Sequence, residues 1–174
     1  MQLRRYGLEL TMSGIIGSAR SRTGLLGTIT APLQPAFLVQ KSAGTLNNVS
    51  NNDNLPYSAE IFDQGNNFDT SNFTFTAPVS WRYQLNVQLD GSSIDASARM
   101  TGFNLVTSNR TYIIRWDTND IFNSDTNEET TWTGSWLCDM DASDTAKVTF
   151  YQVGGSTQYA MTEGASFFSG FLVA

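Results

Sequence analysis

The chain ends in an apolar aromatic segment that restricts the folds it can adopt. Residues Phe167–Val173 contain three phenylalanines and close on Leu-Val. A strand of this composition has to be covered on both faces, because a bare aromatic row or an open sheet edge promotes aggregation. We therefore expect the C-terminal segment to lie inside a β-sheet.

From Ala31 onward the sequence has the rhythm of an all-β protein. Runs rich in Val, Ile, Thr and aromatic residues, bounded by Asn, Asp, Gly, Ser or Pro, recur about every ten residues, which is typical of a sandwich or jelly roll. Trp81–Leu89 alternates apolar and polar residues, which predicts one buried face. Gly44–Asn54 carries five asparagines and predicts a loop. The predicted strands are Ala36–Lys41, Tyr57–Phe62, Asn72–Ala77, Trp81–Leu89, Ser97–Thr107, Thr111–Trp116, Thr130–Asp139, Ala146–Val153 and Phe167–Val173.

Charge divides the chain into a basic arm, residues 1–30, and an acidic head domain, residues 31–174. Residues 1–41 hold five basic side chains and one acidic one, a net charge of +4. Residues 42–174 hold five basic and fifteen acidic side chains, a net charge of −10. A basic arm on an acidic head predicts a tether that docks on another surface while the heads repel one another and stay soluble.

The arm contains an imperfect repeat, in which Ser13–Ser18 recurs as Thr23–Thr28. Apolar pairs bracketed by glycines bury too little area to fold alone, so an ordered arm needs a host surface, and a disordered terminus is the alternative. The repeat also resembles the N-terminal anchor segments of tailed-phage structural proteins, with Met12 at the usual start. The predicted anchoring residues are Ile15, Ile16, Arg20, Arg22, Leu25 and Leu26.

Composition argues against several functions. The chain has no histidine, which excludes Ser-His and Cys-His catalysis, and its single cysteine, Cys138, excludes an intrachain disulfide and is expected to be buried. Carboxylates in predicted loops favour solvated charge over glycoside hydrolysis. We predict no enzyme activity, no cofactor and no metal. No run of about eighteen apolar residues or signal peptide is present, so no membrane association is expected. Four spread arginines without interleaved aromatics argue against nucleic acid.

Two segments have specific alternatives. The acidic run Asp139–Asp144 has the oxygen density for calcium, but it lacks the glycine and the bidentate glutamate of an EF-hand, so an acidic turn is favoured over a calcium site. Trp132 and Trp136 lie four residues apart, hence on the same side of a strand. We favour a place in the core or at a trimer interface over a sugar-stacking platform.

Several motifs resemble the globular head of the complement subcomponent q and tumour-necrosis-factor superfamily, in its viral and bacterial version. The resemblance covers residues 57–90 and 135–174, with Trp81 and Ser143 standing where the family has glycine. A tryptophan at position 81 implies that φ there need not be positive. The residues that carry the motifs are Phe62, Gly65, Asn66, Asn67, Phe68, Phe73, Phe75, Ala77, Pro78, Val79, Tyr83 and the closing run Phe168–Leu172.

The resemblance implies a ten-stranded jelly-roll β-sandwich assembled as a homotrimer around an axis lined by apolar and aromatic side chains. Eleven Phe, six Tyr and four Trp are also many for one small sandwich, and a surplus aromatic face is best hidden against symmetry mates. The predicted trimer interface and core residues are Phe73, Phe75, Tyr83, Phe167, Phe168 and Phe171.

Two functions are favoured by these features, and a third, a secreted bacterial head of the same superfamily, is disfavoured by the missing signal sequence. The first is a non-enzymatic bacteriophage virion protein, a trimeric cement protein made in the host cytoplasm that decorates the capsid exterior. Its arm would bind the major capsid protein. Only a short segment separates Leu26 from the first predicted strand, whereas a tail fibre needs a long shaft. The alternative is the receptor-binding head of a phage fibre, which recognises a host surface glycan through loops such as Asn119–Glu129.

Overall fold

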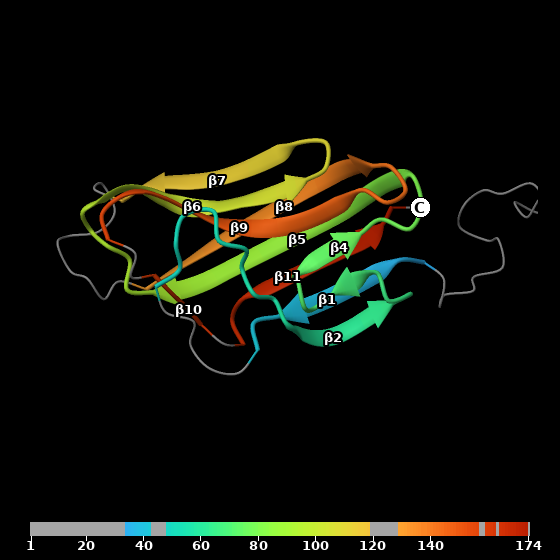
Figure 1. The fold of residues 1–174 in the computed structure, drawn as a ribbon, viewed down its shortest axis with the longest axis horizontal. Coiled ribbons are helices and arrows are strands. Elements are labelled where there is room, and N and C mark those ends of the chain that lie inside the picture. The colour runs from blue at the N-terminus through green and yellow to red at the C-terminus, as the bar shows by residue number, and fades with distance from the viewer. Residues whose placement is uncertain (1–33, 43–47, 119–128, 157–158, 163, 174) are drawn as a thin grey trace, which may run out of the picture. The chain divides into compact units, whose positions relative to one another are not determined.

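The computed structural model describes residues 34–42, 48–118, 129–156, 159–162 and 164–173 (Figure 1). The compact unit that contains them spans Pro32–Val173. The predicted anchoring residues between positions 15 and 26 lie outside the described residues, as does most of the loop proposed to contact a glycan. The division of the chain at residue 30 therefore stays a prediction. Within the described ranges, no helix is long and apolar enough to cross a membrane.

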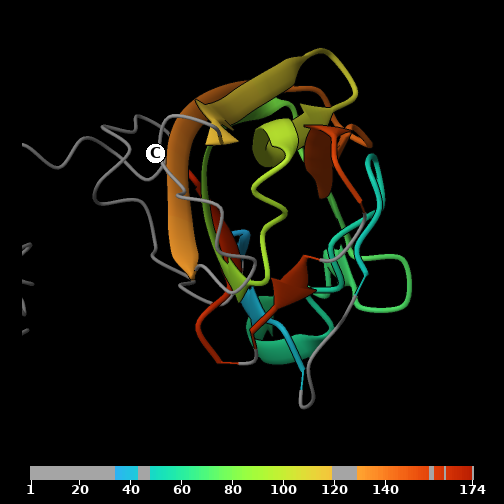
Figure 2. The same ribbon diagram turned by 90° about the vertical axis from the view of Figure 1, so that its left-hand side faces the viewer.

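The described residues form two antiparallel sheets of β-strands packed face to face (Figures 1 and 2). Sheet A has the order β2-β1-β11-β5-β8, with the short β10 also paired to β5, and sheet B has the order β3-β4-β9-β6-β7. The strands are β1 (Ala36–Gln40), β2 (Ala59–Gln64), β3 (Phe68–Asp69), β4 (Thr74–Thr76), β5 (Trp81–Ser92), β6 (Ala98–Thr107), β7 (Thr111–Asp117), β8 (Thr130–Met140), β9 (Thr145–Gly154), β10 (Ala160–Met161) and β11 (Phe167–Leu172).

This arrangement confirms the predicted all-β fold with two antiparallel sheets. Each of the nine predicted segments overlaps one observed strand. The described ranges contain eleven strands, whereas the resemblance implied ten and the sequence pattern predicted nine segments. The two strands absent from the predicted segments are β3 and β10, of two residues each. The C-terminal strand β11 lies between β1 and β5, so both of its edges are paired as its composition demands.

The alternation in β5 puts one set of apolar residues into the core between the sheets. Tyr83, Leu85, Val87 and Leu89 are buried, while the residues between them face outward. An aromatic cluster lies at the centre of this core. The ring centroid of Phe37 lies 4.7 Å from that of Phe75, and 5.0 Å from that of Phe168. Such offset and edge contacts add to the free energy of burial.

About half of the aromatic side chains in the described ranges are buried within the subunit, while Phe62, Trp81, Trp116 and Phe171 are exposed. The twelve largest fully buried side chains include nine aromatic ones. They are Trp132, Tyr57, Tyr83, Tyr159, Phe37, Phe75, Phe103, Phe150 and Phe168. The core of the sandwich is therefore complete within one chain, and an argument for self-association has to rest on particular surface residues.

Candidate functional site

The outer face of sheet A carries three cross-strand rows of side chains, and we call these rows the outer face below. The strand register defines them, since residues opposite one another on paired strands point to the same side. The first row is Gln64, Ala36, Phe171, Gln84 and Leu137. The second is Phe62, Leu38, Ser169, Asn86 and Ser135, and the third is Ala59, Gln40, Phe167, Gln88 and Thr133.

The three rows contain no Asp, Glu, Lys or Arg. Beyond the rows, Arg82 stands opposite Asp139 at one end and Asp90 opposite Thr131 at the other. The exposed Glu60 lies on the edge strand β2, between the second and third rows. Exposed apolar side chains occur in the first two rows. Phe171 is 45% exposed on the central strand β11 and Leu137 is 54% exposed on the edge strand β8, both in the first row. Phe62 is 45% exposed in the second row, on the edge strand β2. A large uncharged face with exposed apolar side chains is typical of an interaction surface.

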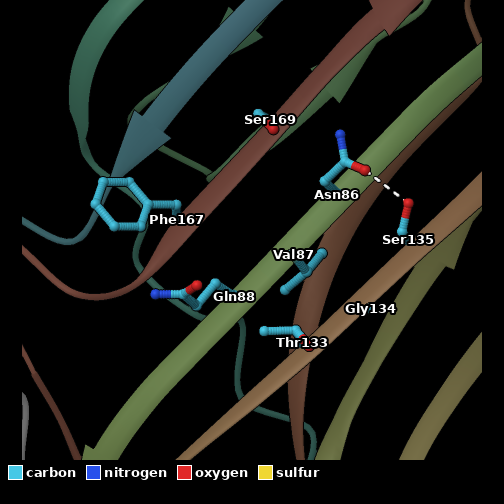
Figure 3. Close-up of a pocket in the computed structure, with 8 residues that line it drawn as sticks. All are labelled: Asn86, Val87, Gln88, Thr133, Gly134, Ser135, Phe167 and Ser169. Carbon is cyan, nitrogen blue, oxygen red and sulfur yellow. Dashed lines mark hydrogen bonds between the residues drawn. The ribbon is translucent and has the colours of Figure 1, made fainter.

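Polar side chains in the middle of this face are already organised by hydrogen bonds. The amide of Gln84 donates to Ser135 Oγ at 2.8 Å. The Ser135 hydroxyl donates to Asn86 Oδ1 at 2.8 Å (Figure 3). Further along β5, Gln88 Nε2 donates to the carbonyl of Ala165 at 2.7 Å. Asn86, Gln88 and Ser135, with residues beside them on β11, β5 and β8, line a shallow depression of about 530 Å³.

The residues predicted for the interface and core divide into two groups in the structure. Phe75, Tyr83 and Phe168 are buried between the sheets, and Phe73 is half-buried against the same cluster with a φ of 61°. Phe167 and Phe171 point outward on the outer face. Sequence reasoning missed the polar members of that face. The alternate positions Gln84, Asn86 and Gln88 carried the signal, but only the strand pairing shows what stands beside them.

Trp132 and Trp136 lie on the inner side of β8. Trp132 is fully buried and contacts the rings of Trp116 and Tyr159, while Trp136 packs against Phe103 and Tyr112. Neither indole is free to serve as a flat platform for a sugar ring.

Cys138 is buried beside Tyr112, where burial raises the pKa of the thiol and, together with the neighbouring sulfur, raises the pKa of Tyr112 to about 12. Both groups are therefore neutral at physiological pH, and this buried pair offers no nucleophile.

The acidic run after β8 forms a hydrogen-bonded turn. Asp144 Oδ2 accepts the backbone N–H of Asp141 at 2.8 Å and the side-chain amide of Asn109 at 2.7 Å. Ser143 has a φ of 76°, the left-handed conformation that glycine adopts without strain, whereas Trp81 simply begins β5. In the described part of the chain, no group of three or more acidic or thiol side chains is placed to hold a metal ion.

Comparison with known proteins supports the fold. No family model matches the sequence, and no curated protein matches it. Among solved structures, the globular domain of zebrafish complement 1qA matches with a TM-score of 0.59 at 15% identity, covering 81% of this chain and 98% of that one. The Eiger tumour necrosis factor of S. frugiperda matches with a TM-score of 0.56 at 11% identity, covering 81% and 93%. The head of this chain therefore has the jelly-roll fold seen in complement 1q and tumour-necrosis-factor domains.

Proposed function

We propose that the protein is a non-enzymatic homotrimeric cement protein that decorates the exterior of a bacteriophage capsid. The observation that carries the trimer is the outer face of sheet A, which exposes Phe171 and Leu137 without any charged neighbour in its three rows. Like-charged acidic heads repel one another, so a charge-free face is the surface at which copies can meet.

The polar residues of the outer face support self-association as well. Gln84, Asn86 and Ser135 already satisfy part of one another's hydrogen-bonding capacity within one subunit. Covering them therefore costs less than covering isolated amides, because a buried polar group without a partner is destabilising. A second copy brings amides and hydroxyls of the same kind, which can pair with the remaining donors and acceptors.

The capsid role follows from the arm. Its apolar pairs, flanked by Arg20 and Arg22, form an anchor for a protein surface, and three arms on one trimer bind together. Individually weak arm contacts then give tight attachment without a large interface per subunit. The short connection from Leu26 to the head leaves no shaft, which favours a protein that lies on the shell over a fibre tip.

The experiment is a binding assay with empty shells of the coat protein encoded by the same genome. The full chain and a variant that lacks residues 1–28 are mixed with shells and separated by sedimentation. We expect the full chain to pellet with the shells at many copies per particle, and the truncated chain to stay in the supernatant while remaining trimeric. Undiminished binding of the truncated chain would refute the anchoring role. If the protein binds a host glycan but does not bind the shells, the receptor-binding alternative is favoured.

A further inference from the structure

The outer face of sheet A carries exposed apolar side chains at both of its margins as well as in its centre. The margins are the edge strands β2 and β8, which lie on opposite sides of the sheet (Figure 1). Phe62 on β2 is 45% exposed, Leu137 on β8 is 54% exposed, and Phe171 on β11 lies between them. Ile61, beside Phe62, is 52% exposed and is skipped where β1 pairs with β2. Apolar area is therefore available along both sides of this face.

The strand ends of the same face carry charge instead. Arg82 stands opposite Asp139 beyond one end of the rows, and Asp90 lies beyond the other end. Glu60 belongs to the β2 margin, but it stands opposite Val39, which is buried between the sheets, so its side chain leaves the strand on the inner side. Copies that meet end to end would bring charges together, whereas copies that meet at the margins would bury apolar area.

Strand β8 is also the least protected edge among the described strands. Within them it pairs only with β5, over eleven residues, and from Thr130 to Cys138 it has no charge, no proline and no β-bulge. The opposite edge, β2, has a β-bulge and carries Glu60 and Asp63. In sheet B, the edge strand β3 has only two residues, and β7 carries two charged side chains. Proteins protect a sheet edge by such devices or cover it, so we expect another chain to cover the edge of β8.

The symmetry of a trimer gives a reason for apolar side chains at both margins. A three-fold axis makes each contact heterologous, so the patch that one copy offers differs from the patch that it meets on the next copy. Three sheets that face a common axis, with their strands along it, form three walls, and each wall meets its neighbours at its two margins. The β8 margin of one copy then lies beside the β2 margin of the next copy, and Phe171 points toward the axis.

We propose that the trimer closes margin to margin, with Leu137 of one copy packed against Phe62 and Ile61 of the next. This inference rests on the proposed function, because it takes the outer face of sheet A as the surface at which three copies meet. Leu137 and Phe62 lie in adjacent rows, which are about 7 Å apart along the strands, a distance that two large side chains can span. The same contact covers the uncharged edge of β8.

An exchange of charges tests the contact with three variants: Phe62→Lys, Leu137→Asp, and the chain that carries both substitutions. Each single substitution places an unpaired charge in an apolar contact. The concentration at the assembly midpoint, measured by sedimentation velocity, is therefore expected to rise at least about tenfold. The double variant is expected to recover most of that loss, because each contact then joins the new lysine of one copy to the new aspartate of the next.

The matched control combines Phe62→Lys with Ile113→Asp. It adds the same two charges, but the aspartate lies on β7 of sheet B, at a side chain that is 49% exposed. This control is expected to assemble no better than Phe62→Lys alone. Circular dichroism checks that every variant keeps the β fold.

A pair of cysteines tests the same contact by cross-linking. Within one chain, β2 and β8 are four strand spacings apart, about 19 Å, so positions 62 and 137 cannot form a disulfide in the same subunit. The chain with Phe62→Cys and Leu137→Cys is expected to form covalent trimers under mild oxidation, seen on non-reducing gels. Either substitution alone is expected to form none. The native Cys138 is buried and is common to all these chains.

The outcomes separate this inference from the proposed function. If the wild type is a single subunit, the proposed trimer fails and the inference fails with it. If the wild type is a trimer and the single substitutions leave its midpoint unchanged, only the contact between the margins is refuted. The same holds if the double variant assembles no better than the control and the cysteine pair gives no covalent trimer. Recovery in the control as well would show that only net charge matters, and this too would overturn the inference.

Discussion

Substitution of Phe171 by aspartate tests the proposed trimer at the residue where apolar exposure on the outer face is clearest. An aromatic side chain exposes roughly 200 Å² when free, so the 45% that remains exposed here amounts to about 90 Å². At about 25 cal/mol per Å², covering it contributes about 2 kcal/mol per subunit. Three copies in a trimer contribute about 6 kcal/mol, and an aspartate adds the cost of covering a charge.

The magnitude translates into a measurable shift in assembly. About 6 kcal/mol corresponds to roughly a 10⁴-fold change in the trimer association constant, at 1.4 kcal/mol per factor of ten. Because three subunits combine, the concentration at the assembly midpoint varies as the inverse square root of that constant, so a 10⁴-fold fall in the constant raises the midpoint about a hundredfold. Sedimentation velocity over a dilution series measures this midpoint. We expect a wild-type trimer at micromolar concentration and a folded monomer for Phe171→Asp.

Ile113→Asp is the matched control, because Ile113 is as exposed as Phe171 but lies on sheet B. It is expected to leave the assembly unchanged, and circular dichroism checks that both variants keep the β fold. A wild type that sediments as a single subunit, or a Phe171→Asp variant that assembles like the wild type, would refute the assignment of this face.

Three further substitutions test how the head is held together. Ser143 has a φ of 76°, a left-handed conformation that strains a residue with a Cβ. Ser143→Gly is therefore expected to raise the free energy of unfolding, measured by urea denaturation, by about 0.5–1 kcal/mol. A lower free energy of unfolding would show that Ser143 is not strained. Gly170→Ala places a Cβ 2.8 Å from a ring carbon of Phe37 in the core. The free energy of unfolding is expected to fall by about 1–3 kcal/mol in the same assay. An unchanged value would show that neighbouring side chains shift to make room for the methyl group. Hydrogen bonds donated by Ser156 and by Ser97 hold the pKa of Asp95 well below its usual value of 3.8 in the folded chain. Its stabilisation is therefore complete above that value and is lost as the pH falls below it. Asp95→Asn should lower the midpoint of urea denaturation at pH 7. The difference in midpoint between the variant and the wild type should be smaller at pH 3 than at pH 7, and a difference that does not change with pH would contradict this linkage.

The strands could be predicted because their burial alternates locally. The alternation over Trp81–Leu89 predicts β5 from its own sequence. The structure buries the apolar positions from Tyr83 to Leu89 and leaves the amides between them half-buried on the outer face, while Trp81 is exposed. The strands that were missed, β3 and β10, contain two residues each, too few for a period of two to be visible. The exact ends of the strands could not be predicted from the alternation of apolar and polar residues either. Strand β5 continues through Asp90-Gly91-Ser92, whose composition suggests a turn, because β8 and β10 supply hydrogen-bonding partners there.

The surface could be predicted only in part, because it depends on which strands become neighbours. Phe167, Phe168 and Phe171 were predicted as a group, yet Phe168 points into the core while the other two point outward. Segments outside the regular strands, such as the one that buries Val49, Leu55 and Tyr57, cover core area that a strand pattern does not reveal.

The distribution of charge is what makes self-association of this head physically reasonable. Residues 42–174 carry a net charge of −10, and a copy of such a head approaching at random meets repulsion from most directions. The three rows of the outer face hold none of these charges. The exposed Glu60 lies at the β2 edge of the same sheet, two strands away from β11, and Asp117 lies on sheet B. Repulsion is therefore lowest where Phe171 and Leu137 provide apolar area to bury. The same charges that keep heads apart in other orientations thus favour this face as the interface, and added salt should weaken that preference by screening them.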